Sequence, residues 1–208
     1  MLNFALNRGV QFPGNGMLCG GAAAGGGHLD MLKYLATIAF RPSQTFITVV
    51  AEAAKHGHTD VVRYGIDQGY HMSYVCTMEA ASGRHLDILK LLVERGCEVS
   101  SETFNCAASS GSLEILQYLF EKSSKACRWE AWTFAARSGN VALMELLWEK
   151  KVSNNPHTIE FAAKENHLGP IKFALDHGFS YDRERVLFIA EKYDRQYLLK
   201  WFKGRLKY

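Results

Sequence analysis

The chain has 208 residues, of which 48% are hydrophobic and 22% charged; this balance is typical of folded proteins and excludes a largely disordered chain. No apolar run approaches the roughly 20 residues of a membrane span, and the first residues lack the basic start and apolar stretch of a secretory signal. The formal charge of +3 is too small to indicate nucleic-acid binding by itself. The five cysteines are an odd number without a C-x-x-C pair, which favours reduced thiols over a disulfide framework.

One pattern of small residues, a polar turn and an amphipathic segment returns along the chain. It reads AAKHGHTDVVRYGIDQGY at 53–70, AASGRHLDILKLLVERGC at 80–97 and AASSGSLEILQYLFEKSS at 107–124. When the second alanine of each copy is its anchor, seven anchors follow at intervals of 30, 27, 27, 28, 27 and 27 residues. The anchors are Ala24, Ala54, Ala81, Ala108, Ala136, Ala163 and a degenerate Ala190. Such regular self-similarity indicates a repeat array.

The start of the chain resembles the second half of a copy, because LNFALNRGV at 2–10 matches IKFALDHGF at 171–179. The expected organisation is a single domain over 1–208, with a partial repeat at 1–12, six repeats at 13–183 and a degenerate capping repeat at 184–208. The edge formed by 1–12 has few charges. Either another subunit or domain covers it, or it packs on the first full copy as a cap. We expect it to be the weaker end of the array and the site of any self-association.

Each copy predicts two helices joined by a polar turn. In one copy Leu86, Leu89 and Val93 fall on one face of the second helix. Glycines fifteen residues after the anchor suit the carboxyl-terminal cap of that helix; they are Gly69, Gly96 and Gly178. No segment predicts a sustained strand. Since one unit cannot bury its apolar face alone, the predicted fold is an all-α solenoid of about seven stacked helix–turn–helix repeats.

The first helix of each copy is shorter and ends in the alanine pair, whose small side chains allow neighbouring helices to approach closely. Bulky residues four and two places before the anchor are expected to pack inward. The second of these registers holds Cys106, Phe134, Phe161 and Phe188. We also expect Trp132 and Trp148 to be buried in the core.

The frame A-A-x-x-G-H-L-D-I-L-K-L-L-x-x-x-G at 80–96 resembles an ankyrin repeat, with Gly83–Arg84 replacing the usual x-Gly. The period near 27 is shorter than the typical 33, and the T-P-L-H start is absent. Both departures resemble a short-period class found in amoeba-infecting giant viruses and protists, whose linker often reads G-C-P-W-D. The linkers at 96–99 and 127–133 echo it. The resemblance implies a binding scaffold in which the projecting β-hairpin finger is cut back to a turn.

Four histidines, His28, His58, His85 and His167, share one register four residues after the anchor. A stacked histidine ladder could suggest a metal site. However, packed helices lie about 8–10 Å apart, whereas each zinc ligand must come within about 2.1 Å of one ion. Ser112, Asn140 and Asp194 occupy the same register. We therefore interpret it as a position whose side chain bonds the backbone at the start of the second helix, and predict no metal.

Catalytic and nucleotide-binding patterns are weak. The stretch CGGAAAGGG at 19–27 lacks the G-K-[ST] ending and the preceding strand of a phosphate-binding loop. Cys106 is interpreted as a small buried hydrophobe, and no Ser/His/Asp or Cys/His set converges. We predict a protein that is not an enzyme and has no cofactor and no small-molecule substrate.

The basic carboxyl-terminal stretch leaves two interpretations open. Its cations are Lys200, Lys203, Arg205 and Lys207. They can form the polar outer face that a terminal repeat needs. Alternatively, a basic amphipathic helix can bind an acidic partner or an anionic membrane surface.

The resemblance implies that a partner protein contacts the linker tips and the two residues after each alanine pair. By register these residues are Lys55, His56, Ser82, Gly83, Ser109, Ser110, Arg137, Ser138, Lys164 and Glu165. Trp129 in a linker is a further candidate, because exposed aromatic residues often anchor partners. An ordinary solvated turn is the alternative at each position.

The predicted function is thus non-enzymatic recognition of a partner protein. A structural role in a larger assembly or virus particle, and nucleic-acid binding through the basic end, are the alternatives. The cysteine content predicts a cytoplasmic, reducing compartment, which for a viral chain would be the host cytoplasm or the virion.

Overall fold

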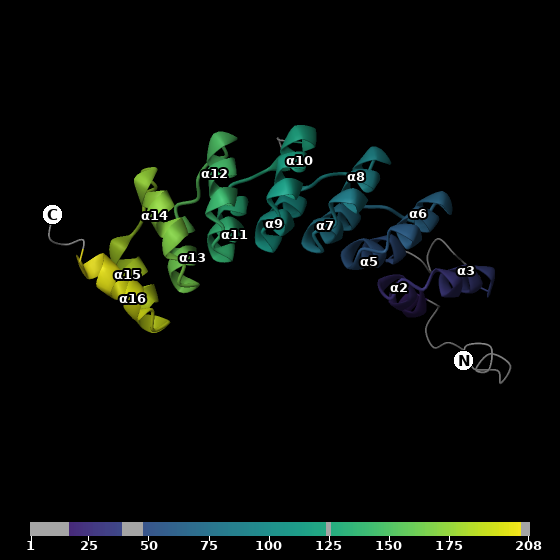
Figure 1. The fold of residues 1–208 in the computed structure, drawn as a ribbon, viewed down its shortest axis with the longest axis horizontal. Helices are drawn as coiled ribbons and strands as arrows, with labels where there is room; N and C mark the ends of the chain where they lie inside the picture. The colour runs from purple at the N-terminus through teal and green to yellow at the C-terminus, as the bar shows by residue number, and fades with distance from the viewer. Residues whose placement is uncertain (1–16, 39–47, 124–125, 205–208) are drawn as a thin grey trace. The chain divides into compact units, whose positions relative to one another are not determined.

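In the computed structural model, residues 17–38, 48–123 and 126–204 are described, and every regular element in them is a helix. The prediction of an all-α fold is confirmed for this part of the chain. Successive helices form pairs joined by short turns (Figure 1). The predicted partial repeat at 1–12, and with it the edge expected to self-associate, lies outside the described residues.

Contacts divide the chain into two compact units, Met1–Glu98 and Val99–Tyr208. The described helices of the first unit form three pairs: α2 (Met17–Gly25) with α3 (Leu29–Ile38), α5 (Val49–His56) with α6 (Thr59–Asp67), and α7 (Tyr74–Ser82) with α8 (Leu86–Glu94). The first helices α2, α5 and α7 pack side by side in this order, and each packs on its own second helix. The prediction that residues 1–208 form a single domain stays a prediction.

The second unit has the same plan with four described pairs. They are α9 (Ser101–Ser110) with α10 (Leu113–Ser123), α11 (Glu130–Ser138) with α12 (Val141–Glu149), α13 (Thr158–Lys164) with α14 (Leu168–Asp176), and α15 (Arg183–Lys192) with α16 (Gln196–Gly204). The first helices α9, α11, α13 and α15 pack against one another in chain order. The second helices α10, α12 and α14 form a parallel row of contacts, so each unit consists of two layers of helices.

The small residues at the anchors lie where first helices meet. All seven predicted anchor alanines are completely buried. In the turn that follows, the backbone adopts a positive φ, for example at Gly57 (83°) and Gly139 (74°). The predicted caps Gly69, Gly96 and Gly178 also have positive φ values, of 68°, 87° and 73°. The prediction of two helices and a tight turn in each described copy is therefore confirmed.

The seventh copy corrects the predicted alignment by one residue. In other copies the amide four residues after the anchor donates to the carbonyl before the anchor, as from His85 to Ala80 (2.9 Å). In the last copy the equivalent bond runs from Arg195 to Ala190 (2.7 Å). Glu191 therefore holds the anchor position, and Ala190 precedes it. Only α13 among the described first helices packs on α15, so Glu191 can point to solvent, and the small-residue pattern used for alignment is lost.

The two registers expected to pack inward behave differently. Four places before the anchor, Phe104, Trp132 and Ile159 are buried. Two places before it, Cys106, Phe134 and Phe161 are only partly buried, and Phe188, which belongs to this register only in the predicted alignment, is 62% exposed. The expected burial of this second register is wrong. Its residues are turned by about 200° around the helix axis from those four places before the anchor, so their side chains point away from the second helices.

The two tryptophans expected in the core also differ. Trp132 on α11 is completely buried, whereas Trp148 on α12 is 44% exposed. Trp148 lies in the last turn of its helix and contacts His177 and Phe179, with ring centroids 4.8 and 5.9 Å apart. The expectation of burial is wrong for Trp148, since these rings cover only part of a large indole in the last helical turn.

Candidate partner-binding surface

The ten predicted contact residues other than Trp129 all lie where first helices end. We call this set the turn surface. In the first unit, Lys55 and His56 end α5, Ser82 ends α7, and Gly83 follows as its cap. In the second unit, pairs of residues end α9 and α11, and α13 ends at Lys164 with Glu165 as its cap. Seven of the ten are exposed: Lys55, His56, Ser82, Ser109, Arg137, Ser138 and Lys164.

Trp129 lies apart from the turn surface. It is 49% exposed and precedes α11 (Glu130–Ser138) at its amino-terminal end. Arg137 and Ser138 occupy the opposite end of the same helix, about 13 Å away at 1.5 Å per residue. Trp129 instead borders a hollow of about 390 Å³ with Phe120, Arg128 and Lys150. The structure therefore does not bring this candidate together with the other ten.

Ion pairs organise part of the turn surface within each unit. In the first unit, the Lys55 ammonium lies 3.7 Å from a carboxylate oxygen of Glu79. In the second, Arg137 Nε lies 3.4 Å from Glu165 Oε1, so two predicted contact residues pair with each other. Exposed pairs of this kind contribute little stability, about 0–1 kcal/mol, but they restrict the positions that the side chains can take.

A shallow hollow accompanies the second pair. It has a volume of about 230 Å³ and is lined by Ser109, Phe134, Arg137, Ser138 and Glu165. Four of these five residues belong to the turn surface, and they come from three successive turns of the second unit. The fifth, Phe134, lies in the register whose burial was wrongly expected. The hollow is therefore lined by one aromatic side chain and four polar or charged residues.

Side chains in the histidine register fasten one turn to the next. His58 Nε2 lies 2.9 Å from the Gly25 carbonyl, and His167 Nε2 lies 3.1 Å from the Arg137 carbonyl. In the seventh copy Arg195 takes the same role and donates to the Lys164 carbonyl at 3.0 and 2.7 Å. Each acceptor is the residue directly after the preceding anchor, so this register holds the backbone of the turn surface in place.

The sequence interpretation of this register is therefore partly wrong. His58, His85, Asn140 and His167 occupy the amino-terminal cap positions as expected, but none of them accepts a capping hydrogen bond from its own helix. The imidazole ring extends instead across the preceding turn. A methyl group placed on Gly57 would overlap the His85 ring. The turn glycine thus provides room for the ring of the next copy as well as a positive φ.

Sequence reasoning missed a larger groove between α13 and α15, which we call the α13–α15 groove. It has a volume of about 400 Å³ and combines apolar with charged side chains. Its lining residues are His157, Glu160, Phe161, Lys164, Arg185, Phe188, Ile189, Lys192 and Tyr193. The predicted register two places before the anchor could have indicated it, because it contained Phe161 and, with Ala190 as the anchor, Phe188; we expected that register to lie in the core.

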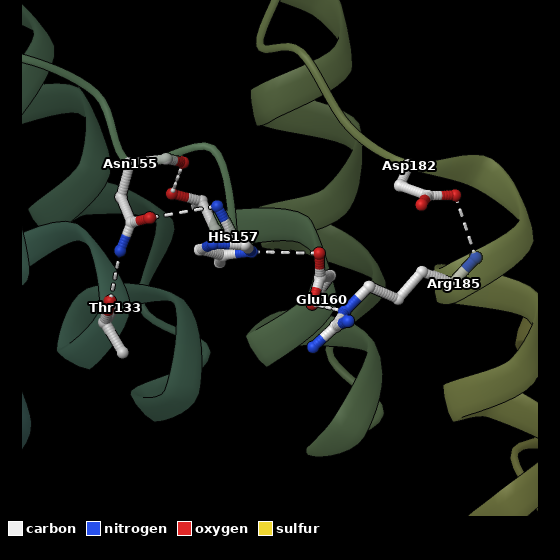
Figure 2. Close-up of polar contacts among 7 residues, drawn as sticks. Thr133, Asn155, His157, Glu160, Asp182 and Arg185 are labelled. Carbon is white, nitrogen blue, oxygen red and sulfur yellow. Dashed lines mark hydrogen bonds and ion pairs between the residues drawn. The ribbon is translucent and has the colours of Figure 1, made fainter.

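One wall of the groove is a buried carboxylate. The Glu160 side chain is 9% exposed and receives hydrogen bonds from Arg185 Nε at 2.6 Å and from His157 Nδ1 at 3.0 Å (Figure 2). Arg185 is anchored locally, because its backbone amide donates to the Asp182 carboxylate that caps α15 (3.0 Å). Burying a charge is costly unless it is paired, so this arrangement ties α13 to α15.

Polar contacts behind Glu160 fix the start of α13. Asn155 is buried; its side-chain amide donates to Thr133 Oγ1 at 2.6 Å, and its oxygen accepts from the His157 amide at 2.9 Å (Figure 2). The Thr158 hydroxyl donates to the Asn155 carbonyl at 2.7 Å. These bonds hold the wall of the groove to α11.

Neither Cys127 nor Cys76 belongs to the turn surface or lines the α13–α15 groove. Burial raises the pKa of the Cys127 thiol to about 12, with a smaller contribution from the nearby Glu130 carboxylate. Cys76 is buried and its thiol interacts with that of Cys97, whose hydrogen bond lowers the pKa of Cys76. Within 17–38, 48–123 and 126–204, no three His, Cys, Asp or Glu residues are grouped as metal ligands.

In the described part of the chain, no helix has both the length and the apolar composition needed to cross a bilayer.

The comparisons with known proteins agree with the helix-pair architecture. Residues 20–103 match the family model for ankyrin repeats, described as three copies. A comparison with curated proteins finds no match. Among solved structures, the ankyrin repeat domain of human ASB11 is similar, with a TM-score of 0.62 and 16% identity over 81% of this chain and 84% of that chain. The resemblance to the short-period class of giant viruses and protists stays a prediction. Residues 20–103 are thus similar to ankyrin repeats, and the chain has the all-α helical-repeat fold of an ankyrin repeat domain.

Proposed function

We propose that the chain is a non-enzymatic module that recognises a partner protein through its turn surface. Ankyrin repeats are in general protein–protein interaction modules, which supports this assignment at the level of the fold. The observation that carries it is the exposure of polar side chains at the ends of the first helices within each unit, for example Lys55 and Ser82 in the first and Ser138 and Lys164 in the second.

The fixed backbone of the turns supports the same proposal. The carbonyls after the anchors accept hydrogen bonds from the next copy, as His58 and His167 show. A preorganised surface loses less conformational entropy when a partner binds. The pair between Arg137 and Glu165 likewise restricts two contact side chains before binding.

Site-specific photo-crosslinking in the native cell tests the proposal. A photoreactive amino acid is placed at Ser109 or Ser138 on the turn surface, and at Gln117 or Ala142 on the second helices as matched controls. All four positions are exposed in the second unit. We expect one partner protein to be crosslinked from the turn positions and not from the controls. Equal crosslinking from both sets, or crosslinking from the controls alone, would contradict the proposal.

A further inference from the structure

The α13–α15 groove has an apolar centre that is open to solvent. Phe188 is 62% exposed and Tyr193 is 37% exposed, while Phe161 and Ile189 are partly buried beside them. A volume of about 400 Å³ falls within the 300–1,000 Å³ typical of ligand pockets. Exposed aromatic residues in such hollows are common anchor points at protein interfaces, so the groove has room for a few side chains of a bound segment.

The rim of the groove carries positive charge that the protein does not neutralise. Glu160 is the one carboxylate among the lining residues, and it is engaged by Arg185 and His157. Lys164 and Lys192 form no ion pair within the described residues, and their ammonium groups lie 5.3 and 5.7 Å from the Tyr193 ring. Two lysines next to an exposed aromatic ring form a site complementary to carboxylates beside an apolar group.

The positive charge of the rim does not extend to α11. On the neighbouring helix α11, Arg137 is paired with Glu165 at 3.4 Å, so the cationic rim does not continue along the row of first helices. Proteins that bind single-stranded nucleic acid instead combine stacking rings with a positively charged track along the backbone. A local charge patch around an apolar centre therefore favours a short acidic peptide segment over a nucleic acid.

We propose that the α13–α15 groove binds a segment of a protein partner in which an aromatic or large aliphatic side chain is flanked by carboxylates. The apolar side chain packs against Phe188 and Phe161, and the carboxylates face Lys164 and Lys192. This inference rests on the proposed function, because it identifies the class of partner segment and the place where it binds. Lys164 links the groove to the turn surface, since it belongs to both.

Selection from a displayed library of random peptides on the full chain tests the inference. We expect the selected peptides to contain an aromatic or large aliphatic residue with aspartate or glutamate on both sides. Their affinity should fall as salt rises, because exposed charges are screened. The variant Phe188→Ala should weaken them about tenfold or more, as truncation of an interface anchor does. The double variant Lys164→Glu with Lys192→Glu should abolish binding.

Matched controls keep these effects specific to the groove. Tyr197→Ala removes a second exposed aromatic ring, 63% exposed on α16, and Lys200→Glu with Lys203→Glu reverses two exposed lysines on the same helix. Both controls should bind the selected peptides like the unchanged chain. Because Phe188 is exposed, its variant should also unfold at an unchanged temperature.

The inference would be overturned by selected peptides without acidic flanks, by equal weakening in the groove and control variants, or by the absence of any selected peptide. Binding of a single-stranded oligonucleotide that is lost in the groove variants would overturn it as well. If crosslinks from Ser109 and Ser138 are still found in any of these cases, the inference about the groove fails while the proposed function stands.

Discussion

The two tryptophans of α11 and α12 allow a quantitative test of the packing. Trp132→Ala removes a completely buried side chain whose Nε1 donates to the Val152 carbonyl at 3.2 Å. Its ring also meets Phe179 edge-on at 5.0 Å. Truncation of a buried tryptophan costs about 3–5 kcal/mol, and the lost hydrogen bond accounts for about 1 kcal/mol of this cost. We expect a loss of about 4–5 kcal/mol in the free energy of unfolding.

Trp148→Ala is the matched control, because it removes the same side chain from a position that is 44% exposed. Its contacts with His177 and Phe179 are partial, and such aromatic pairs contribute about 0.5–1.5 kcal/mol. Urea unfolding followed by far-ultraviolet circular dichroism measures both variants. At about 2 kcal/mol per molar urea, the midpoint should fall by about 2 M for Trp132→Ala and by about 0.5 M for Trp148→Ala. Equal shifts, or a larger shift for Trp148→Ala, would refute the packing.

Further predictions concern the turns and a cysteine. His85→Asn should cost less than about 1 kcal/mol, because Asn140 already serves in that register; stoichiometric zinc that is lost in this variant would contradict the structural role. Gly83→Ala should destabilise by about 1–3 kcal/mol in urea unfolding, because its methyl group would overlap the Lys55 carbonyl oxygen. A neutral result would contradict that contact. Cys127 should react slowly with iodoacetamide at pH 8, because a pKa of about 12 leaves little thiolate. Rapid alkylation of Cys127 in the folded chain would contradict its burial.

The repeat architecture could be predicted because it depends on local patterns. The anchor alanines and the turn glycines recur at nearly constant intervals, and each has a direct structural requirement: close helix approach or a positive φ. The same reasoning found that Trp132 faces the core. The alignment was wrong by one residue in the last copy. A helix that packs on one neighbour does not need a small residue on its open side, so Glu191 stands where the other copies have the anchor alanine.

The candidate groove could not be predicted in the same way. Hydrophobic character alone does not say which face of a helix a register occupies, so Phe161 and Phe188 were assigned to the core. The pairing of Glu160 with Arg185 joins side chains 25 residues apart, and only the packing of α13 against α15 brings them together. Trp129 was a candidate only as a linker aromatic residue, and the sequence could not show that it lies at the opposite end of α11 from Arg137 and Ser138.

The central claim is that a partner protein binds the turn surface, and its most direct test is the affinity of the crosslinked partner for two double variants. Ser109→Arg with Ser138→Arg adds bulk and charge to two exposed turns, whereas Gln117→Arg with Ala142→Arg adds the same side chains to exposed positions on the second helices. Isothermal titration calorimetry should show affinity reduced about tenfold or more by the first pair and changed less than about twofold by the second. Unchanged affinity for the turn variant, or an equal loss in both, would contradict the claim.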